Sequence, residues 1–394
     1  MDKKKLLFIS HEASRSGAPV LVLNLLQKLR HQYPNFVVDI LLLKYGELYG
    51  DFASVADNVY LVHPHKQAPS FFKRNIKRVK SLFFSPKKKS EQDKIDQIIN
   101  SLFLNNYDLV YGNTIVSLSW TLPFYRDGIP TIVAIHELTF GIENTYPKEF
   151  VKENIKNISQ IIAGSQTVAN NLILKYGANE YDINIIHSFI DSDLQITKEK
   201  SVLRKELNIP EDQLLIGIVS AQELRKGTDL VPMLVQKIKQ KTDVDFKFIN
   251  VGGTFNSPFV MTSYLDAEKL GVLDKIIYVD HNRTPTDYIN ILDIFLVLSR
   301  EDPFPLVMLS AAKLKKTIVA FEKSGGAEEF LQDDHGILIP YLDIDKMATE
   351  VARLLQKRDL RQKLGEKIFE RLEIEYSEQK KTKQIFNLID KLIN

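Results

Sequence analysis

Short apolar runs alternate with longer amphipathic stretches along the first half of the chain. The apolar runs are rich in Val and Ile and are bounded by polar residues or glycine, which is typical of parallel strands covered on both faces. We therefore expect six strands, with the sequences KLLFIS, FVVDILLL, NVYLV, YDLVYGN, TIVAIHE and QIIAGS. The stretch PVLVLNLLQKLRHQY is predicted to be a helix with Pro19 in its first turn. This alternation predicts an open parallel sheet with right-handed crossovers.

The same pattern restarts after a polar connector near residues 191–200. A second series of six strands is expected at LLIGIVS, FKFINVG, KIIYVD, DIFLVLS, TIVAF and GILIP, again with helices between them. The final segment, YSEQKKTKQIFNLIDKLIN, is predicted to be a lysine-rich amphipathic helix. We infer an α/β protein with two Rossmann-like parallel-sheet domains, residues 1–193 and 194–374, followed by a helix over residues 375–394. Ligands of such folds bind at the carboxyl ends of the strands, so site residues should directly follow strands.

Length and composition narrow the class of protein. A chain of 394 residues suits two domains, and 44% hydrophobic with 26% charged residues is ordinary for a globular protein. A net charge of only +2 argues against a protein built to hold nucleic acid. The absence of cysteine excludes disulfides, a thiolate nucleophile and a zinc–thiolate site, and it fits a reducing cytosol. The apolar run Leu6–Ile9 is too short for a signal peptide, and no apolar stretch has the length of a membrane span.

Two candidate residues follow strands in the first half. Gly17 precedes the first predicted helix, whose free N–H groups and dipole favour an anionic group, although an ordinary strand-to-helix loop would look the same. The dinucleotide fingerprint G-x-G-x-x-G is missing there, which excludes a typical NAD site. His136 ends the strand TIVAIHE, where open sheets keep their sites, although a structural histidine is the alternative.

Two adjacent cations, Arg225 and Lys226, lie between a strand and a helix in the second half. Cations held beside a helix N-terminus form a suitable clamp for a diphosphate, because fixed donors and the helix dipole act together. The alternative is a solvated charge pair. It does not explain the position of the cations, because the helix dipole disfavours positive charge at the N-terminus of a helix.

Two glycine pairs also follow strands in the second half. Gly252 and Gly253 come after FINV, and Gly325 and Gly326 belong to the segment SGGAEEF. Glycine lets the backbone approach a nucleotide closely, although each pair is equally compatible with a tight turn.

With these residues in view, the chain resembles the retaining, nucleotide-sugar-dependent glycosyltransferases of family four, which have the two-Rossmann architecture called GT-B. The resemblance is strongest between about Leu214 and Arg353, and it runs in order over nearly the whole chain. The segments that carry it are SREDPFPLVML, SGGAEEF, GILIP followed by DIDKMATEV, RKG after a strand, and IHE in the first half. The segment EDPFPLV is specific, whereas the others are individually weak. The resemblance implies two domains that face each other across a cleft, an acceptor-side domain first and a donor domain second, with the C-terminal helix returning to the first domain.

The resemblance also implies roles for individual residues. Lys226, with Arg225 assisting, would neutralise the diphosphate of a nucleoside diphosphate sugar, and Glu301 and Asp302 would lie beside the transferred sugar. His136 would reach the reacting sugar from the first domain. The nucleotide side would consist of Gly17, Arg225, Lys226, Gly252, Phe304, Pro305, Leu306, Ser310, Gly326 and Glu329. No metal and no further cofactor is expected, because lysine, arginine and helix dipoles replace a divalent cation.

Two positions depart from the family pattern. The family's pair of glutamates, separated by seven residues, falls here on Asp302 and Ser310, and the arginine that usually precedes the lysine falls on Ala221. These departures keep open a second hypothesis, a non-catalytic partner of an active glycosyltransferase. A nucleotide-sugar epimerase is a third hypothesis, but it needs an acid–base set that the sequence does not indicate.

The segment from Lys66 to Ser90 holds nine basic residues and no acid, with four phenylalanines among them. This composition suits an anionic membrane surface, and the alternative is a solvated loop. We therefore expect transfer of a hexosyl or deoxyhexosyl group, with retention, to a hydroxyl of a glycan or lipid-linked glycan, as in cell-surface polysaccharide synthesis. The protein would be cytoplasmic or peripheral on the inner face of the cell membrane, with a protein partner or a second copy as a further expectation.

Overall fold

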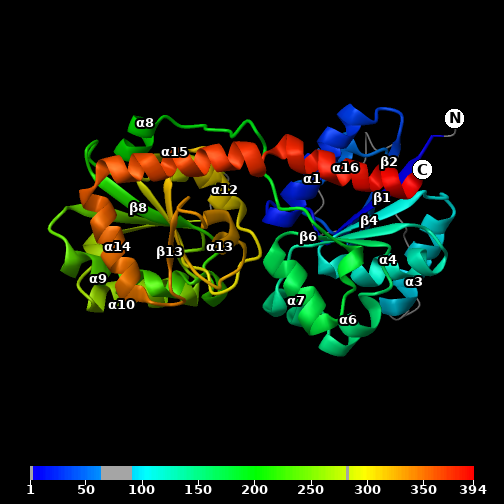
Figure 1. Ribbon diagram of the computed structural model, residues 1–394, viewed down its shortest axis with the longest axis horizontal. Coiled ribbons are helices and arrows are strands. Elements are labelled where there is room, and N and C mark those ends of the chain that lie inside the picture. Colours follow the sequence, from blue (N-terminus) through cyan, green and yellow to red (C-terminus); the bar gives the residue numbers. More distant parts are fainter. Residues whose placement is uncertain (1–2, 64–90, 281–283) are drawn as a thin grey trace. The chain divides into compact units, whose positions relative to one another are not determined.

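The computed structural model describes residues 3–63, 91–280 and 284–394. The basic segment of residues 66–90 lies outside the described residues. The chain divides into two compact units (Figure 1): Met1–His187 with Gln379–Asn394, and Ser188–Glu378. The sequence-based boundaries were placed at 193/194 and 374/375. Each unit contains one parallel sheet, which confirms the prediction of two Rossmann-like domains.

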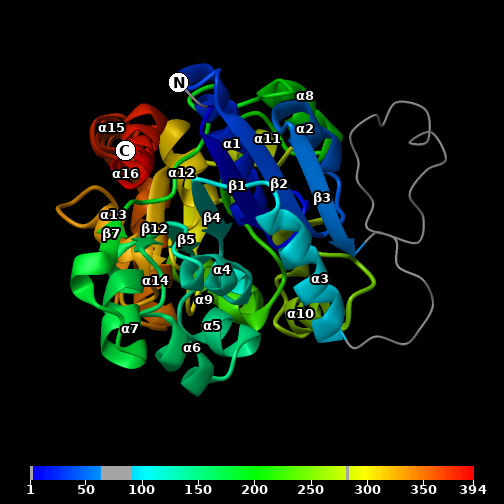
Figure 2. The ribbon, with the colours of Figure 1, turned by 90° about the vertical axis from the view of Figure 1, so that its right-hand side faces the viewer.

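The first unit is built on a seven-stranded parallel sheet in the order β3-β2-β1-β4-β5-β6-β7. Its strands are β1 (Lys5–Ser10), β2 (Val37–Lys44), β3 (Asn58–His63), β4 (Leu109–Asn113), β5 (Thr131–Ile135), β6 (Gln160–Ala163) and β7 (Ile183–Ile185). The strands β1, β2 and β3 lie side by side in Figure 2. The six expected strands are present. The seventh, β7, was not predicted, because three half-buried residues at a sheet edge do not form an apolar run.

Helices cover both faces of this sheet. They are α1 (Gly17–Gln32), α2 (Tyr49–Val55), α3 (Glu91–Phe103), α4 (Leu118–Arg126), α5 (Thr139–Thr145), α6 (Lys148–Asn154) and α7 (Gln166–Tyr176). Two apolar clusters, one around Leu7, Ile9 and Phe124 and one around Val133, Ile135 and Ile142, lie on the same face, because Ile9 and Val133 are both in register with Gly112. On the opposite face, Leu6 and Phe8 are completely buried. Because the strands are buried on both faces, their sequences are continuous apolar runs rather than alternating ones.

The last helix, α16 (Glu378–Ile393), belongs to the first unit for almost all of its length. The Tyr33 hydroxyl donates to Asp390 Oδ2 at 2.5 Å, and Lys4 Nζ donates to the carbonyl oxygen of Ile393 at 2.6 Å. The ring of Phe386 meets Tyr33 edge-on at 5.7 Å. The predicted return of the C-terminal helix to the first domain is confirmed.

The second unit has a six-stranded parallel sheet in the order β10-β9-β8-β11-β12-β13. The strands are β8 (Leu214–Val219), β9 (Phe246–Val251), β10 (Ile276–Val279), β11 (Ile294–Val297), β12 (Thr317–Phe321) and β13 (Ile337–Ile339), all six as expected. The helices are α8 (Lys200–Glu206), α9 (Val231–Lys241), α10 (Pro258–Lys269), α11 (Pro285–Ile291), α12 (Leu306–Lys313), α13 (Gly326–Leu331), α14 (Ile344–Gln356) and α15 (Arg358–Glu375). One apolar cluster fills each face of this sheet.

Both sheets change their direction of winding beside their first strand. In the first unit the chain places β2 and β3 on one side of β1 and β4 on the other, and in the second unit β9 and β10 lie on one side of β8 and β11 on the other. Such a switch point opens a crevice at the carboxyl ends of the two central strands, where ligands of open α/β sheets bind.

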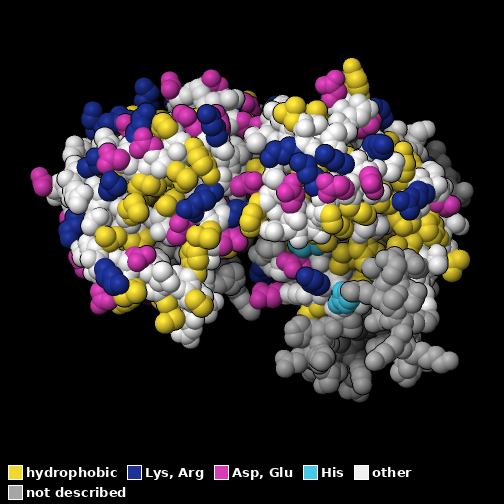
Figure 3. Space-filling view, turned by 90° about the horizontal axis from the view of Figure 1, so that it is seen from below, with side chains coloured by type: hydrophobic (Ala, Val, Ile, Leu, Met, Phe, Trp, Pro, Cys, Tyr) yellow, Lys and Arg dark blue, Asp and Glu magenta, His cyan; other side chains and the backbone are white. Residues whose placement is uncertain are grey.

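The described residues bear on two expectations, the lack of a membrane span and the small net charge. None of the helices in the described part of the chain combines the length and apolar character that a bilayer crossing needs. On the face seen in Figure 3, Lys and Arg side chains are interspersed with Asp and Glu on both units, in keeping with the small net charge.

Candidate active site

Two charged residues meet at the switch point of the second sheet. Lys226 ends a short 3-10 turn (Leu224–Lys226) after β8, and Asp302 lies in the loop after β11. Lys226 Nζ donates to Asp302 Oδ2 at 2.5 Å, with side chains 18% and 8% exposed. The residues are 76 positions apart in the sequence, so only the fold brings this predicted cation and this predicted acid together.

Gly227 fixes where the Lys226 turn runs. Its φ is +69°, and a Cβ built on it would lie 1.9 Å from the carbonyl oxygen of Leu298, the residue that directly follows β11. Any side chain here would collide with backbone, so only glycine lets the turn pass this close to the neighbouring strand.

Arg225, the second predicted cation, is engaged within the protein. Its Nη1 donates to the carbonyl oxygen of Glu301 at 3.0 Å, and its Nη2 pairs with Glu223 at 2.7 Å. The N–H of Glu301 in turn donates to the carbonyl oxygen of Arg225 at 3.4 Å. Arg225 therefore connects the turn that carries Lys226 to the acidic loop, the loop that carries Glu301 and Asp302.

The glycine pair after β12 packs against the same acidic loop. The N–H of Asp302 donates to Ser324, and the N–H of Gly326 donates to the carbonyl oxygens of Asp302 and Pro303 at 3.1 and 3.0 Å. A Cβ on Gly325, whose φ is +128°, would lie 1.9 Å from the carbonyl oxygen of Asp302. The close approach that these glycines permit is thus between two backbone segments of the protein.

The remaining residues of the predicted nucleotide side lie around α12 and α13. Phe304 is 5% exposed and stacks on Tyr376 at 5.6 Å, so its ring belongs to the core. Pro305 is the N-cap of α12, and Leu306 is its first residue. The Ser310 hydroxyl, 7% exposed, donates to the carbonyl oxygen of Leu306 at 3.3 Å.

Glu329 lies in the first turn of α13. Negative charge in the first turn of a helix interacts favourably with the helix dipole. This placement explains a glutamate there without a ligand.

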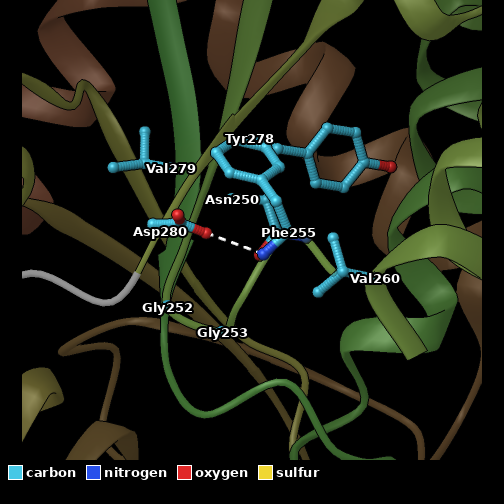
Figure 4. A pocket seen from close by; sticks show the side chains of 8 residues that line it. All are labelled: Asn250, Gly252, Gly253, Phe255, Val260, Tyr278, Val279 and Asp280. Carbon is cyan, nitrogen blue, oxygen red and sulfur yellow. Dashed lines mark hydrogen bonds between the residues drawn. The ribbon is translucent and has the colours of Figure 1, made fainter. Parts of the chain in front are cut away.

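A pocket opens at the carboxyl ends of β9 and β10 (Figure 4). It is a shallow pocket lined by Asn250, Gly252, Gly253, Phe255, Val260, Tyr278, Val279 and Asp280. Gly252 and Gly253 both have positive φ, and a Cβ on Gly252 would lie 2.2 Å from the carbonyl oxygen of Ser220. Asp280 Oδ1 accepts the N–H of Phe255 at 2.8 Å, the contact drawn in Figure 4. Gly252 was predicted, whereas Asp280 was missed although it directly follows the strand KIIYV.

In the first unit, Gly17 is the first residue of α1, as expected. Asn113, at the end of β4, donates from Nδ2 to the carbonyl oxygen of Ala18 at 2.9 Å and so ties the start of α1 to the switch point.

His136 directly follows β5, and its environment differs from that of an ordinary structural histidine. Both ring nitrogens are buried, and neither has a hydrogen-bond partner among the described residues. Burial lowers the pKa of His136 to about 4, with a further contribution from His11. The imidazole is therefore neutral near pH 7 and can donate one hydrogen bond and accept another.

Glu137 holds the loop that carries His136. Its carboxylate accepts the N–H of Ile115 at 3.1 Å and the N–H of His136 at 2.9 Å. Burial raises the pKa of Glu137 to about 7, although both hydrogen bonds favour the charged form.

His11, whose charge would affect His136, and Thr114, which contacts His11, were not predicted from the sequence. His11 follows β1, and its Nδ1 lies 3.5 Å from Thr114 Oγ1 after β4. Thr114 has a φ of +76°, which is rare for a β-branched residue and is often found at functional sites. The position of His11 directly after a strand was a usable signal, but nothing in the sequence indicates the conformation of Thr114. Within residues 3–63, 91–280 and 284–394, no group of three or more His, Asp or Glu side chains is arranged to hold a metal ion.

Two family models match the chain. The model "Glycosyltransferase Family 4" matches residues 16–194, and "Glycosyl transferases group 1" matches residues 199–371. The first match covers the first unit except for β1 and α16, and the second match covers most of the second unit.

The chain belongs to the family-four glycosyltransferases.

Curated relatives of this glycosyltransferase have several different activities. It is 23% identical over 290 residues to the N-acetyl-alpha-D-glucosaminyl L-malate synthase of Bacillus anthracis, which covers 66% of the chain and 73% of that protein. It is 30% identical over 131 residues to the O-antigen biosynthesis glycosyltransferase WclY of Escherichia coli, about a third of either chain. It is 25% identical over 269 residues to a D-inositol 3-phosphate glycosyltransferase of Catenulispora acidiphila, covering 63% of the chain and 62% of that protein.

Solved structures of low sequence identity share the fold of the glycosyltransferase. HepE of Anabaena in complex with UDP-glucose is 17% identical, with a TM-score of 0.77 over 98% of the chain and 99% of the solved chain. WaaG, a glycosyltransferase involved in lipopolysaccharide biosynthesis, is 13% identical, with a TM-score of 0.67 over 94% and 95%. These likenesses confirm the GT-B fold.

Proposed function

We propose that this glycosyltransferase transfers a hexosyl or deoxyhexosyl group from a nucleoside diphosphate sugar to a hydroxyl of a glycan or lipid-linked glycan, with retention of configuration. The observation that carries the proposal is the pair of Lys226 and Asp302 at the switch point of the second sheet. The UDP-glucose bound to HepE of Anabaena supports a nucleotide-sugar donor. The O-antigen and lipopolysaccharide roles named for WclY and WaaG support a glycan acceptor.

In this proposal, Lys226 receives the negative charge of the leaving diphosphate. As the bond from the anomeric carbon to the diphosphate lengthens, positive charge develops on the sugar and negative charge on the departing oxygen. Asp302 holds the ammonium group in place before the donor binds, and with Glu301 it then accepts hydrogen bonds from the sugar hydroxyls. Loss of one preorganised donor of this kind typically costs about 3–4 kcal/mol in the transition state.

The nucleotide would lie along the backbone that follows β9, β11 and β12. Gly252 lines the pocket at the ends of β9 and β10. The first N–H groups of α12, from Leu306 onward, point out of the N-terminus of the helix, which is the end that favours anions. Gly326 and Arg225 form hydrogen bonds with the acidic loop, so in this proposal they stabilise its conformation. A divalent metal is not needed in this arrangement, because Lys226 and the helix dipole supply the positive charge.

The first unit would hold the acceptor and the reacting sugar. His136 presents a neutral imidazole that has buried nitrogens and no partner among the described residues, as a group that hydrogen-bonds a substrate hydroxyl would. Gly17 would border the same edge of the sheet through the start of α1. For the segment 66–90, outside the described residues, we propose contact with an anionic membrane surface that carries a lipid-linked acceptor, which would make the protein peripheral on the cytoplasmic side.

Calorimetric titration tests the donor site. We expect at least one of UDP, GDP, ADP and dTDP to bind the wild-type chain in buffer with EDTA, and Lys226→Ala to weaken that binding by about tenfold or more, because a hydrogen bond to a charged group is lost. Lys275→Ala is the matched control, since Lys275 Nζ also pairs at 2.5 Å, with Asp245, and is 19% exposed. Equal affinity of Lys226→Ala and wild type would rule out the assignment of Lys226.

A non-catalytic partner protein is the second candidate function, and Ser310 favours it. Its hydroxyl is bonded to the carbonyl oxygen of Leu306, at the position where the resemblance implies a glutamate for the nucleotide ribose. A wild-type chain that binds none of the four nucleoside diphosphates would support this alternative. Binding followed by transfer to an acceptor, with the product anomer read by NMR coupling constants, would exclude it and would test retention.

A further inference from the structure

Two arginines join the turn that carries Lys226 to the loop that carries Asp302. Arg225 reaches from the turn to the loop, where it contacts the carbonyl oxygen of Glu301. Arg300 reaches in the opposite direction, from the loop to the turn.

Arg300 holds the turn at both ends. Its guanidinium forms a two-pronged pair with Asp229, with Nη1–Oδ1 at 2.7 Å and Nη2–Oδ2 at 2.8 Å. Nη1 also donates to the carbonyl oxygen of Leu224 at 2.5 Å, and the backbone N–H donates to the carbonyl oxygen of Arg225 at 2.7 Å. Leu224 is the first residue of the 3-10 turn, and Asp229 lies three residues after its last residue, Lys226. Arg300 therefore contacts residues on both sides of Lys226 in the sequence.

The geometry of this pair makes it a stiff connection. A planar guanidinium that meets a carboxylate through two parallel bonds fixes orientation as well as distance, which a lysine cannot do. Both side chains are 29% exposed, so solvent screens the pair only partly. The hydrogen bonds to Asp229 raise the pKa of Arg300, so the guanidinium stays charged.

The turn needs such a connection because it has little stability of its own. It contains three residues of 3-10 helix and then Gly227 in the left-handed region, and it has no apolar side chain that is buried. Lysine carries a long flexible side chain, so the position of its ammonium depends on where the backbone is held. Asp302 lies two residues beyond Arg300, on the same short loop.

We propose that Arg300, through Asp229 and the carbonyl oxygen of Leu224, is a positioning residue that sets the distance between Lys226 and Asp302 for donor binding. The proposal rests on the proposed function of these two residues. Arg300 does not touch the donor in this role, and it acts only through the Lys226 turn.

Hydrogen exchange of the chain without nucleotide tests the connection itself. In Arg300→Met and in Asp229→Asn we expect peptides from residues 222–230 and 298–304 to exchange about tenfold faster than in wild type, because the two loops then open independently. Arg300→Lys should give an intermediate rate. Arg353→Met is the control, because Arg353 pairs with Glu350 at 2.7 Å on α14, away from both loops. Unchanged exchange of both loops in Arg300→Met would overturn the proposal.

A double-mutant cycle on nucleotide affinity tests the functional role. Arg300→Met should weaken binding of the nucleoside diphosphate by about tenfold in the wild-type background and by nothing further in Lys226→Ala, because both changes remove the same interaction. Transfer assays should show the donor KM rising while the acceptor KM stays unchanged. Additive losses in the cycle would overturn the proposal, since Arg300 would then act independently of Lys226. If the wild-type chain binds no nucleotide, the proposed function is wrong and so is the proposed role of Arg300 in donor binding. The hydrogen-exchange data still decide whether Arg300 holds the two loops together.

Discussion

Lys316 is a buried lysine that directly precedes β12. It is 8% exposed, and its Nζ donates to the carbonyl oxygen of Asn290 at 2.7 Å. Burial, with repulsion from Lys200 and Arg204, lowers its pKa to about 7. The unfolded chain, with an ordinary lysine pKa, therefore binds a proton that the folded chain partly lacks between pH 7 and about 10.

This linkage predicts how Lys316→Met changes stability with pH. In wild type the contribution of Lys316 becomes more unfavourable as the pH falls from about 10 to 7, because the unfolded state binds more protons. The free energy of unfolding of Lys316→Met relative to wild type should therefore be highest near pH 7 and should decrease by about 1–3 kcal/mol toward pH 10. Urea unfolding at pH 7, 8.5 and 10 measures it. Lys315→Met, an exposed neighbour paired with Glu366, is the control; a pH-independent difference for Lys316→Met would contradict the expectation.

At the residue scale, three titratable residues of the candidate site could be predicted from the sequence more easily than the residues that hold the surrounding loops in place. Lys226, Asp302 and His136 were predicted because each follows a strand in a parallel sheet. Asp229 and Arg300 were not, because an arginine near an aspartate is common on protein surfaces, and these two are 71 residues apart. Ser310 was predicted to face the nucleotide, and its role remains a prediction, although its hydroxyl is bonded within α12.

At the scale of elements, glycines decide how closely the loops of the second unit pack. Gly227 and Gly271 have nearly equal φ values, +69° and +66°. A Cβ on Gly227 would lie 1.9 Å from the carbonyl oxygen of Leu298, whereas a Cβ on Gly271 meets nothing within 4 Å. Substitutions of Gly227 and Gly271 therefore separate the effect of a close backbone contact from the effect of the left-handed conformation.

We expect Gly271→Ala to lower the free energy of unfolding by about 1 kcal/mol, the usual conformational penalty. Gly227→Ala should lower it by about 3 kcal/mol or more, because the turn must also move away from β11 and the contact of Lys226 with Asp302 is lost. Denaturant unfolding of both variants at one pH measures the difference. Equal effects of the two substitutions would show that the turn moves without penalty.

Most of the elements could be predicted from the sequence, for a physical reason. A strand buried on both faces must be apolar along its whole length, so twelve runs were recognised without knowledge of their neighbours. The short β7 was missed, since a half-buried edge strand of three residues has no such requirement.

At the scale of the whole molecule, α16 links the end of the chain to its beginning. Ile389 is completely buried on this helix, between Phe386 and Asp390, which both contact Tyr33. The stability of the first unit should therefore depend on residues that follow the second unit in the sequence.

Ile389→Ala should lower the stability of the first unit by about 2–5 kcal/mol, as is usual when a large buried aliphatic side chain is truncated. Hydrogen exchange should become faster in peptides of β1 and β2, while peptides of β8 and β9 keep their wild-type rates, because each unit has its own core. Ile374→Ala, on the 69% exposed Ile374 of α15, should change neither set. Faster exchange confined to the second unit would contradict the assignment of α16 to the first.

The sequence alone determined the class of the fold and the number of sheets, and it indicated the loops that carry the candidate site, because burial on two faces and glycine-permitted turns leave local patterns. Only the tertiary structure decided which of these loops meet. Lys226 contacts Asp302, and Arg300 contacts Asp229, across more than 70 positions of sequence. The order of strands in the sheet makes β8 and β11 neighbours, and no local pattern of hydrophobic and polar residues records that order.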